Sequence, residues 1–213
     1  MAAPRLGQAP QMSLFAGRLA GGFSGGRRHP LDASSWVDHF PGWLAQPDAL
    51  FAALAEQASW EQRSRWMYTN EVVEPRLTSE FDSIAAARVP ELQRVTDDIS
   101  RHYGVTYDSA WLNLYRDQED STGWHADRPA DGLPTAIVPV LSLGATRRFL
   151  VRPRAGGKSI VFIVEAGDLV VMGGRCQRDW VHMVPKESQR VGARISVNFG
   201  SSEQLSALTM PPR

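Results

Sequence analysis

At 213 residues, with 43% hydrophobic and 22% charged residues, the chain has the composition of a globular protein and room for one domain with an extension. A single cysteine, Cys176, excludes an intramolecular disulfide and indicates a reducing compartment. No apolar signal segment and no run long enough to cross a membrane occurs, so we expect a cytoplasmic protein without membrane contact.

Residues 1–45 are rich in glycine, alanine and proline and predict a partly flexible extension, followed by a folded domain at 46–205 and a tail at 206–213. Apolar residues at helical spacing predict a first helix with its N-cap at Asp48. A second helix is predicted to have Pro90 in its first turn. Both helices are therefore expected early in the chain.

The second helix is predicted to end before Gly104, after which alternating apolar and polar residues indicate strands. The predicted strands are residues 109–115, 135–143, 148–152, 159–164, 169–172 and 194–199. A turn at 165–168 is expected to join two of them as a hairpin. Short strands separated by glycine- and proline-rich turns predict an α+β fold that is mainly β, a two-sheet sandwich or jelly roll with the early helices bracing one sheet.

Positive charge is concentrated in the second part of the chain, since residues 1–120 have a formal charge of −5 and residues 121–213 one of +5. A cluster of cations without an acid lies between residues 147 and 158 and consists of Arg147, Arg148, Arg152, Arg154 and Lys158. Such a cluster is either the solvated face of a hairpin or a surface that contacts phosphates, and the sequence leaves both readings open.

Residues 123–127, Gly-Trp-His-Ala-Asp, place an imidazole and a carboxylate two positions apart, so on an extended segment both side chains point to the same side. His182 precedes the last predicted strand and is the candidate third ligand. Two histidines and one carboxylate form the facial triad of non-haem Fe(II) oxygenases, which keeps the opposite face of the metal open. The alternative is that His125 is an ordinary surface or core histidine, since His-x-Asp is common by chance.

The last predicted strand has one polar face, formed by Arg194, Ser196 and Asn198. If that face is buried, its side chains need polar partners, because an unpaired buried cation is strongly unfavourable. A dicarboxylate ligand would supply those partners. Asn113 and Tyr115 share a face of the strand at 109–115, and they either bind the same ligand or lie on a wet outer face.

These residues together resemble the AlkB family of oxidative dealkylases. The resemblance runs from about residue 67 to residue 200 and includes the segment EVVEPRL at 71–77. Its motifs are Asn113-Leu114-Tyr115, His125-Ala126-Asp127, Ser142-Leu143-Gly144, His182 and Arg194-x-Ser-x-Asn-Phe. It implies a double-stranded β-helix fold that uses Fe(II), with 2-oxoglutarate and O₂ as cosubstrates. It also implies removal of alkyl groups from damaged nucleobases of DNA or RNA, with release of an aldehyde, succinate and CO₂.

Carried over residue by residue, the resemblance implies that His125, Asp127 and His182 are the catalytic iron ligands. It assigns the 2-oxoglutarate contacts to Asn113, Tyr115, Arg194, Ser196 and Asn198. Many members have a second arginine six residues after the first, where this chain has Gly200. Many also have an acidic residue two places after the metal aspartate, where this chain has Pro129. The contact to the C1-carboxylate and the preference for a base are therefore not carried over.

Contacts to nucleic acid are predicted around this site. The aromatic side chains of Trp66 and Tyr68 would stack on an extruded base, unless they belong to the core. The candidate phosphate contacts are Arg76, Arg128, Arg147 and Arg148.

Three functions are compatible with the sequence. The first is a monomeric dioxygenase that dealkylates nucleic acid, and the basic second part of the chain favours it. The second is a dioxygenase of the same fold that acts on a protein or a small molecule, which the net charge of zero leaves open. The third is a jelly-roll binding module without enzymatic activity.

Overall fold

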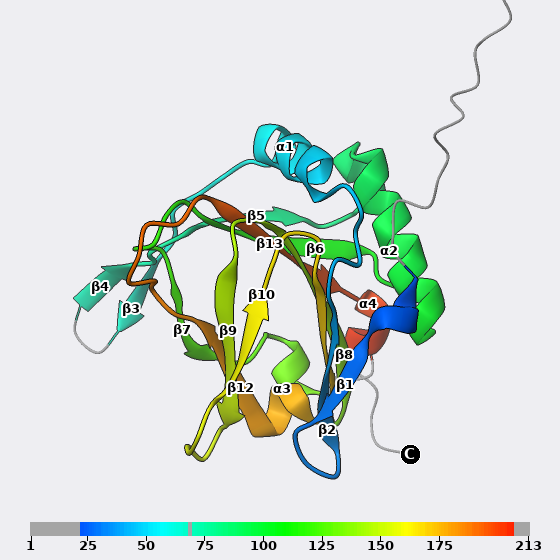
Figure 1. Ribbon diagram of the computed structural model, residues 1–213, viewed down its shortest axis with the longest axis vertical. Coiled ribbons are helices and arrows are strands. Elements are labelled where there is room, and N and C mark those ends of the chain that lie inside the picture. Colours follow the sequence, from blue (N-terminus) through cyan, green and yellow to red (C-terminus); the bar gives the residue numbers. More distant parts are fainter. Residues whose placement is uncertain (1–21, 68–69, 207–213) are drawn as a thin grey trace, which may run out of the picture.

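The computed structural model describes residues 22–67 and 70–206, which form a sandwich of antiparallel sheets (Figure 1). The strands are β1 (Arg27–Pro30), β2 (Ser35–Phe40), β3 (Ser64–Met67), β4 (Asn70–Val73), β5 (Leu77–Phe81), β6 (Ser109–Tyr115), β7 (Thr122–His125), β8 (Ala136–Gly144), β9 (Arg147–Pro153), β10 (Ile160–Val164), β11 (Leu169–Gly174), β12 (Trp180–Val184) and β13 (Arg194–Gly200). The helices are α1 (Pro47–Gln57), α2 (Pro90–Tyr103), α3 (Cys176–Asp179) and α4 (Ser202–Ser206), with 3-10 turns η1 (Phe23–Gly25), η2 (Ala85–Ala87) and η3 (Ala130–Gly132). No helix in the described ranges is both long and apolar enough to cross a membrane.

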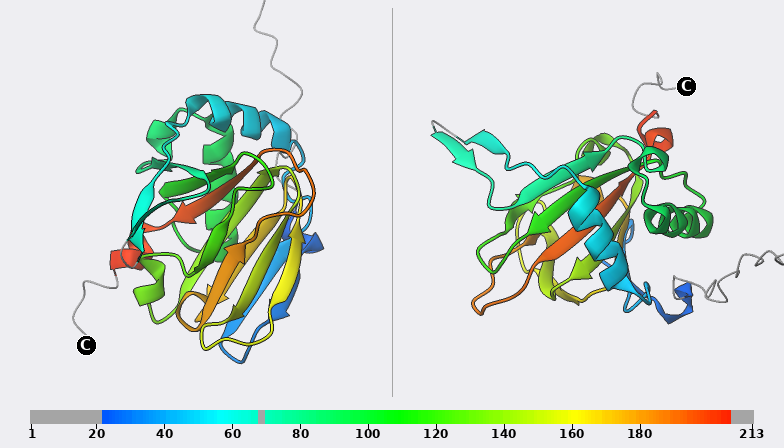
Figure 2. Two further views of the ribbon diagram at one scale, coloured as in Figure 1. Left: turned by 90° about the vertical axis from the view of Figure 1, so that its left-hand side faces the viewer. Right: turned by 90° about the horizontal axis from the view of Figure 1, so that it is seen from above.

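Two sheets face each other across the interior of the domain. The larger has seven strands in the order β1-β2-β11-β8-β13-β6-β5, and the smaller has four in the order β10-β9-β12-β7. The β3–β4 hairpin forms a separate two-stranded sheet that projects from the sandwich (Figure 2). Neighbouring strands in both larger sheets run antiparallel, as in the predicted jelly roll, which is thereby confirmed.

Helices α1 and α2 pack on the outer face of the larger sheet, as predicted (Figures 1 and 2). Helix α1 begins with Pro47 after an N-cap at Gln46, so the prediction of an N-cap at Asp48 is wrong. Proline suits the first turn because its φ is already helical, and Asp48 lies in that turn, where its charge complements the helix dipole. Helix α2 begins at Pro90 and is followed by Gly104, whose φ of 66° is the left-handed conformation that ends many helices.

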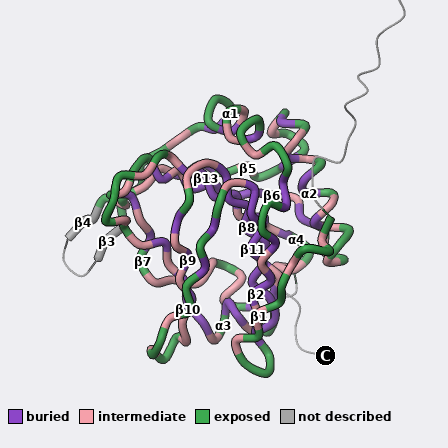
Figure 3. The backbone as a smooth tube through the Cα atoms, viewed as in Figure 1, coloured by how far each residue is buried: buried purple, intermediate pink, exposed green. Residues whose placement is uncertain are grey.

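Alternation along β6 and β13 divides an apolar face from a polar one. Leu112 and Ile195 are fully buried in the core beneath the two helices. Most of β13 is drawn as buried in Figure 3. Their polar neighbours point the other way, into the space between the sheets. There Ser196 lies opposite Asn113 of β6 and Ser142 of β8 in the strand register. The polar faces predicted from the sequence are therefore inside the sandwich and not on a wet surface.

The N-terminal part differs from the prediction. Residues 27–40, expected within a flexible extension, form β1 and β2, and β2 pairs with β11. Val37 and Phe40 of β2 are buried, with 0% and 6% of their surface exposed, so the domain begins earlier than predicted. Glycines and prolines on both sides of this short strand concealed its alternation. Residues 1–21, the first part of the predicted extension, and residues 207–213, most of the predicted tail, lie outside the described residues.

The predicted hairpin around residues 165–168 is also wrong. β10 pairs with β9 in the smaller sheet, whereas β11 pairs with β2 and β8 in the larger one, so this turn crosses between the sheets. Local sequence indicates a turn but does not specify the partners of the strands that flank it. β7 and β12 were not predicted at all, and these two strands carry His125 and His182.

Candidate active site

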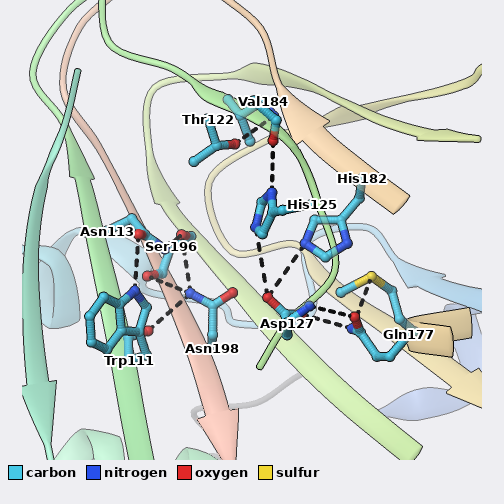
Figure 4. Close-up of polar contacts among 12 residues, drawn as sticks. Trp111, Asn113, Thr122, His125, Asp127, Gln177, His182, Val184, Ser196 and Asn198 are labelled. Carbon is cyan, nitrogen blue, oxygen red and sulfur yellow. Dashed lines mark hydrogen bonds and ion pairs between the residues drawn. The ribbon is translucent and has the colours of Figure 1, made fainter. Parts of the chain in front are cut away.

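Two neighbouring strands of the smaller sheet and one loop bring the three predicted metal ligands together. His125 ends β7 and lies opposite His182 of β12 in the strand register, and Asp127 follows two residues later (Figure 4). Their candidate ligand atoms all lie within 4.8 Å of one another. Asp127 Oδ1 is 3.5 Å from His182 Nε2 and 3.9 Å from His125 Nε2. This donor set matches the two-histidine, one-carboxylate triad of Fe(II) sites.

Hydrogen bonds and burial hold these ligands in the forms that a metal requires. The Nδ1 atom of His125 lies 2.8 Å from the carbonyl oxygen of Gly123, which leaves Nε2 as the donor to a metal. Burial, with the adjacent His182 ring, lowers the pKa of His125 to about 4. Burial alone would raise the pKa of Asp127, but His182, His125 and Gln177 together hold it at about 2. At neutral pH the site therefore has a neutral imidazole and an ionised carboxylate.

A buried arginine lies on the larger sheet across from the metal ligands. Arg194 is 2% exposed, and its Nε donates a 2.9 Å hydrogen bond to Ser142 Oγ. Its Nη1 is buried without a hydrogen-bond partner among the described residues. The guanidinium carbon lies 5.3 Å from the centre of the Tyr115 ring. A buried cation with a free donor needs an anionic partner, and a ligand carboxylate is the chemical group that fits it.

Hydrogen bonds fix the amide of Asn113 beside this arginine. Its Oδ1 accepts from Arg76 Nε at 2.8 Å and from Trp111 Nε1 at 3.1 Å. Its Nδ2 donates to Ser196 Oγ at 3.2 Å, which sets which end of the amide is the donor (Figure 4). On the same face, Asn198 Nδ2 donates to the carbonyl oxygen of Trp111 at 2.9 Å. These polar side chains form a continuous network on the inner face of β6 and β13.

The metal ligands and the polar network open onto one cavity of about 770 Å³ between the sheets. All five predicted 2-oxoglutarate contacts line it, and so do His125, Asp127 and His182. Apolar side chains complete its wall, among them Leu133, Val138, Val140, Phe149 and Val184. Three candidate metal donors share this cavity with an arginine nitrogen that no described residue hydrogen-bonds, which fits an iron ion and an organic acid bound side by side.

The predicted phosphate contacts are in different environments. Arg128 is exposed and lies at the cavity wall. Arg76 is turned inward, with Nε on Asn113 and Nη2 3.1 Å from Glu74 Oε2, so its role as a surface contact is not supported. Arg148 is half-exposed, and its Nε donates to Glu187 Oε2 at 3.0 Å.

Arg147 is not a surface residue, and its prediction as a phosphate contact is wrong. Only 1% of it is exposed, and its guanidinium donates to the backbone carbonyl oxygens of Asp117 and Asp120. The rest of the cation cluster is also largely engaged: Arg152 stacks on Trp124 at 4.1 Å, and Arg154 donates to the backbone carbonyls of Gln177 and Arg178. A run of cations in sequence does not show which of them fold inward.

Of the two predicted stacking residues, only Trp66 lies in the described part of the chain. Trp66 belongs to β3, and its side chain is not among those described. Tyr68 lies outside the described residues. Among the described aromatic residues that line the cavity is Trp111, and the Arg63 guanidinium lies 4.3 Å from the centre of its ring.

Three residues that shape the site were not predicted to belong to it: Trp111, Ser142 and Gln177. Alternation along β6 places Trp111 on the face of Asn113 and could have found it. Ser142 lies within a motif of the resemblance but had no assigned role until the strand register placed it against Arg194. Gln177 lies in α3, far from Asp127 in sequence, and no local pattern indicates the two hydrogen bonds between them.

The family described as the 2OG-Fe(II) oxygenase superfamily matches residues 52–200. The chain is 30% identical over 181 residues to the alpha-ketoglutarate-dependent dioxygenase alkB homolog 3 of Bos taurus, covering 75% of this chain and 63% of that protein. It is 28% identical over 134 residues to the DNA oxidative demethylase ALKBH2 of Arabidopsis thaliana, covering 52% of this chain and 43% of that protein. The chain thus spans just under two thirds of the length of the first of these relatives.

Solved structures show the same fold at low sequence identity. OsALKBH1 superposes with a TM-score of 0.58 at 15% identity, covering 82% of this chain and all of the other. An oxidoreductase of the 2OG-Fe(II) oxygenase family from Burkholderia pseudomallei superposes with a TM-score of 0.52 at 15% identity, covering 79% of this chain and 88% of the other. These likenesses support the jelly-roll architecture.

Proposed function

The chain belongs to the 2OG-Fe(II) oxygenase superfamily, and we propose that it is a dioxygenase that oxidatively removes alkyl groups from damaged bases of DNA or RNA. The resemblance to the AlkB family is confirmed by the alkB homologues among its relatives. The observation that carries the proposal is the shared cavity, in which a His-Asp-His cluster faces the buried Arg194, whose Nη1 has no hydrogen-bond partner within residues 22–67 and 70–206.

His125, Asp127 and His182 would hold the iron, and Arg194 would bind the carboxylate of 2-oxoglutarate remote from the metal. Asn113, Tyr115, Ser196 and Asn198 line the same side and would orient the acid. Iron, when bound with the keto acid and O₂, supplies the oxidising chemistry, which yields succinate and CO₂. The chain itself binds, orients and shields the reactants.

Nucleic acid is the substrate class that the relatives and the charge distribution favour. One relative is named a DNA oxidative demethylase, and residues 121–213, which contain all three predicted ligands, carry a formal charge of +5. A base inside a duplex would have to be extruded into the cavity, whose apolar wall would exclude water around the alkyl group. Hydroxylation of an alkyl carbon on a ring nitrogen gives a hemiaminal, which releases the aldehyde and restores the base.

Trp66, which belongs to β3, and Tyr68 remain our proposed stacking residues for the extruded base. Arg128 remains the proposed phosphate contact, because it is exposed at the cavity wall.

The test is anaerobic binding of Fe(II) and 2-oxoglutarate, followed by product analysis on a panel of alkylated oligonucleotides. We expect succinate formation that a methylated oligonucleotide stimulates and that rising salt weakens, because phosphate contacts release counterions. Turnover of 2-oxoglutarate that no oligonucleotide stimulates would point instead to a protein or small-molecule substrate. If no condition gives iron-dependent turnover of 2-oxoglutarate, the remaining interpretation is a binding module without enzymatic activity.

We also propose that the protein acts as a monomer in the cytoplasm. The single cysteine, Cys176, is buried and free, which suits a reducing compartment. Sedimentation at several concentrations tests the monomer, and fractionation of cells tests the compartment.

A further inference from the structure

Gln177 contacts Asp127 through both ends of its side-chain amide. Its Oε1 accepts a 2.8 Å hydrogen bond from the backbone N–H of Asp127, and its Nε2 donates a 2.7 Å hydrogen bond to Asp127 Oδ2 (Figure 4). Nε2 also lies 3.6 Å from the sulfur of Met172. Gln177 is 2% exposed and sits on the short helix α3, between β11 and β12. A flipped amide would place Oε1 against Oδ2, so the orientation has one satisfactory choice.

This arrangement distinguishes the two oxygens of the carboxylate. Oδ2 is held by Gln177, whereas Oδ1 is the oxygen near Nε2 of His182 and His125, at 3.5 and 3.9 Å. A carboxylate with both oxygens free can bind a cation through one or through both. With Oδ2 engaged, Asp127 offers a single oxygen to a metal.

The number of oxygens matters because the positions around an octahedral ion are few. His125, His182 and a one-oxygen Asp127 would occupy three positions of such an ion and would leave three for a chelating keto acid and O₂. A carboxylate that bound through both oxygens would leave only two. The hydrogen bond to Oδ2 therefore bears directly on whether the site can hold all its reactants.

We propose that Gln177 is a positioning residue that holds Asp127 as a one-oxygen ligand and ties the loop after β7 to α3. This inference rests on the proposed function, since it assumes that the cluster binds a metal. Gln177 touches neither the metal position nor the substrate, and acts through Asp127 alone.

Gln204 offers a matched control at the wall of the cavity that the three candidate metal ligands line. The amide of Gln204 also clasps a backbone unit, since its Oε1 accepts from Ile137 N–H at 2.8 Å and its Nε2 donates to the Ile137 carbonyl at 3.1 Å. Gln204 lines the cavity but contacts no metal ligand in the described structure. Glutamine to methionine therefore removes one accepted and one donated amide hydrogen bond at each position, but only at Gln177 is the acceptor a carboxylate.

The test uses cobalt(II) as an oxygen-stable probe of the metal site in the full-length protein without iron. Gln177→Met is expected to bind cobalt(II) about 10–100-fold more weakly than the unaltered protein, with an altered visible absorption spectrum. Gln204→Met is expected to keep both the affinity and the spectrum. Thermal unfolding of the metal-free variants separates a general loss of folding from a loss of ligand geometry.

A second variant keeps the test decisive if Gln177→Met does not fold. Gln177→Glu retains the acceptor for the Asp127 backbone N–H but puts a carboxylate oxygen against Oδ2, and we expect weaker cobalt(II) binding or an altered spectrum. Unchanged affinity and spectrum in the folded variant would overturn the role of Gln177. No cobalt(II) binding by the unaltered protein would instead overturn the proposed metal site, so the two failures are distinguishable.

Discussion

The two halves of the candidate site are built differently. The acid-binding half lies on the larger sheet and is closed to solvent, with Arg194, Ser196 and Asn113 exposed by 2%, 3% and 7%. The proposed metal-binding half is more open at two of its three ligands, since the side chains of His125 and Asp127 are 37% and 24% exposed, whereas that of His182 is 8% exposed. The proposed 2-oxoglutarate contacts thus lie on a buried sheet face. The more exposed candidate metal ligands lie where a substrate could reach them.

Strand geometry accounts for this difference. β13 is paired in regular register with β6 on one side and β8 on the other, so every second side chain points to the cavity. The β7–β12 pair is short, and its register shifts between His182 and Val184. A regular sheet centre gives rigidity, whereas an irregular edge lets Asp127 leave the strand and reach the two histidines. In the proposed function, the regular sheet therefore carries the cosubstrate contacts, and the end of a strand carries the metal ligands.

The largest effect on activity is expected from substitution of a candidate metal ligand. Asp127→Ala removes one of three ligands, and we expect iron binding and turnover to be abolished, a loss beyond the 10–100-fold typical for removal of an outer hydrogen-bond partner. Anaerobic Fe(II) titration and succinate formation measure it. The control is Asp131→Ala, a carboxylate that lines the cavity outside the donor cluster and should leave iron content unchanged. Full iron content in Asp127→Ala would refute the ligand assignment.

The proposed 2-oxoglutarate contact of Arg194 is tested by Arg194→Met, which retains a long side chain but removes the buried charge. We expect the Kd for 2-oxoglutarate to rise about 10–100-fold, because a hydrogen bond to a charged group contributes about 1.5–3 kcal/mol. Affinity for nucleic acid should change much less. Ser142→Ala removes only the partner of Nε and should produce a smaller rise. The reverse pattern, with nucleic acid affected most, would mean that Arg194 faces the substrate.

Arg147, a buried cation of β9, is expected to contribute to stability and not to binding of nucleic acid. Arg147→Met should lower the free energy of unfolding by about 1–3 kcal/mol, because two backbone carbonyls lose a buried donor. Denaturant unfolding measures this, and nucleic-acid affinity of the folded variant should be unaltered. Arg154→Met is the exposed counterpart, with donors on two backbone carbonyls at 2.9 and 3.0 Å, and should lose about 1 kcal/mol or less. Weaker nucleic-acid binding by Arg147→Met at unchanged stability would contradict the buried role.

The smallest effect is expected at the cavity rim. Arg128→Ala should weaken nucleic-acid binding by about 0.5–1 kcal/mol, as for an exposed ion pair, and should reduce the salt dependence by about one counterion. Fluorescence anisotropy at several salt concentrations measures both. Arg148→Ala should change less, because Glu187 already binds its guanidinium. An equal or larger effect of Arg148→Ala would mean that nucleic acid binds nearer to Arg148 than to Arg128.

The sequence predicted the regular parts of the molecule. The strand at 109–115, the final strand and the second helix were found because alternation, helical spacing and a terminal glycine are local signals. β1, β2, β7 and β12 were missed, since each is short or irregular and is held in place by distant partners. The burial of Arg147 was missed for the same reason, because its acceptors are backbone carbonyls on another loop.

By itself, the sequence determined which residue types occupy each face: a polar stripe at Arg194, Ser196 and Asn198, and a histidine two positions from an aspartate. Side-chain direction in a strand follows from local backbone geometry, so this much needs no fold. Only the tertiary structure decided that His182 lies opposite His125, that Gln177 clasps Asp127, and that a polar stripe and a metal cluster share one cavity. Pairing between strands and contacts between loops depend on the whole chain packing at once, and no short segment carries that information.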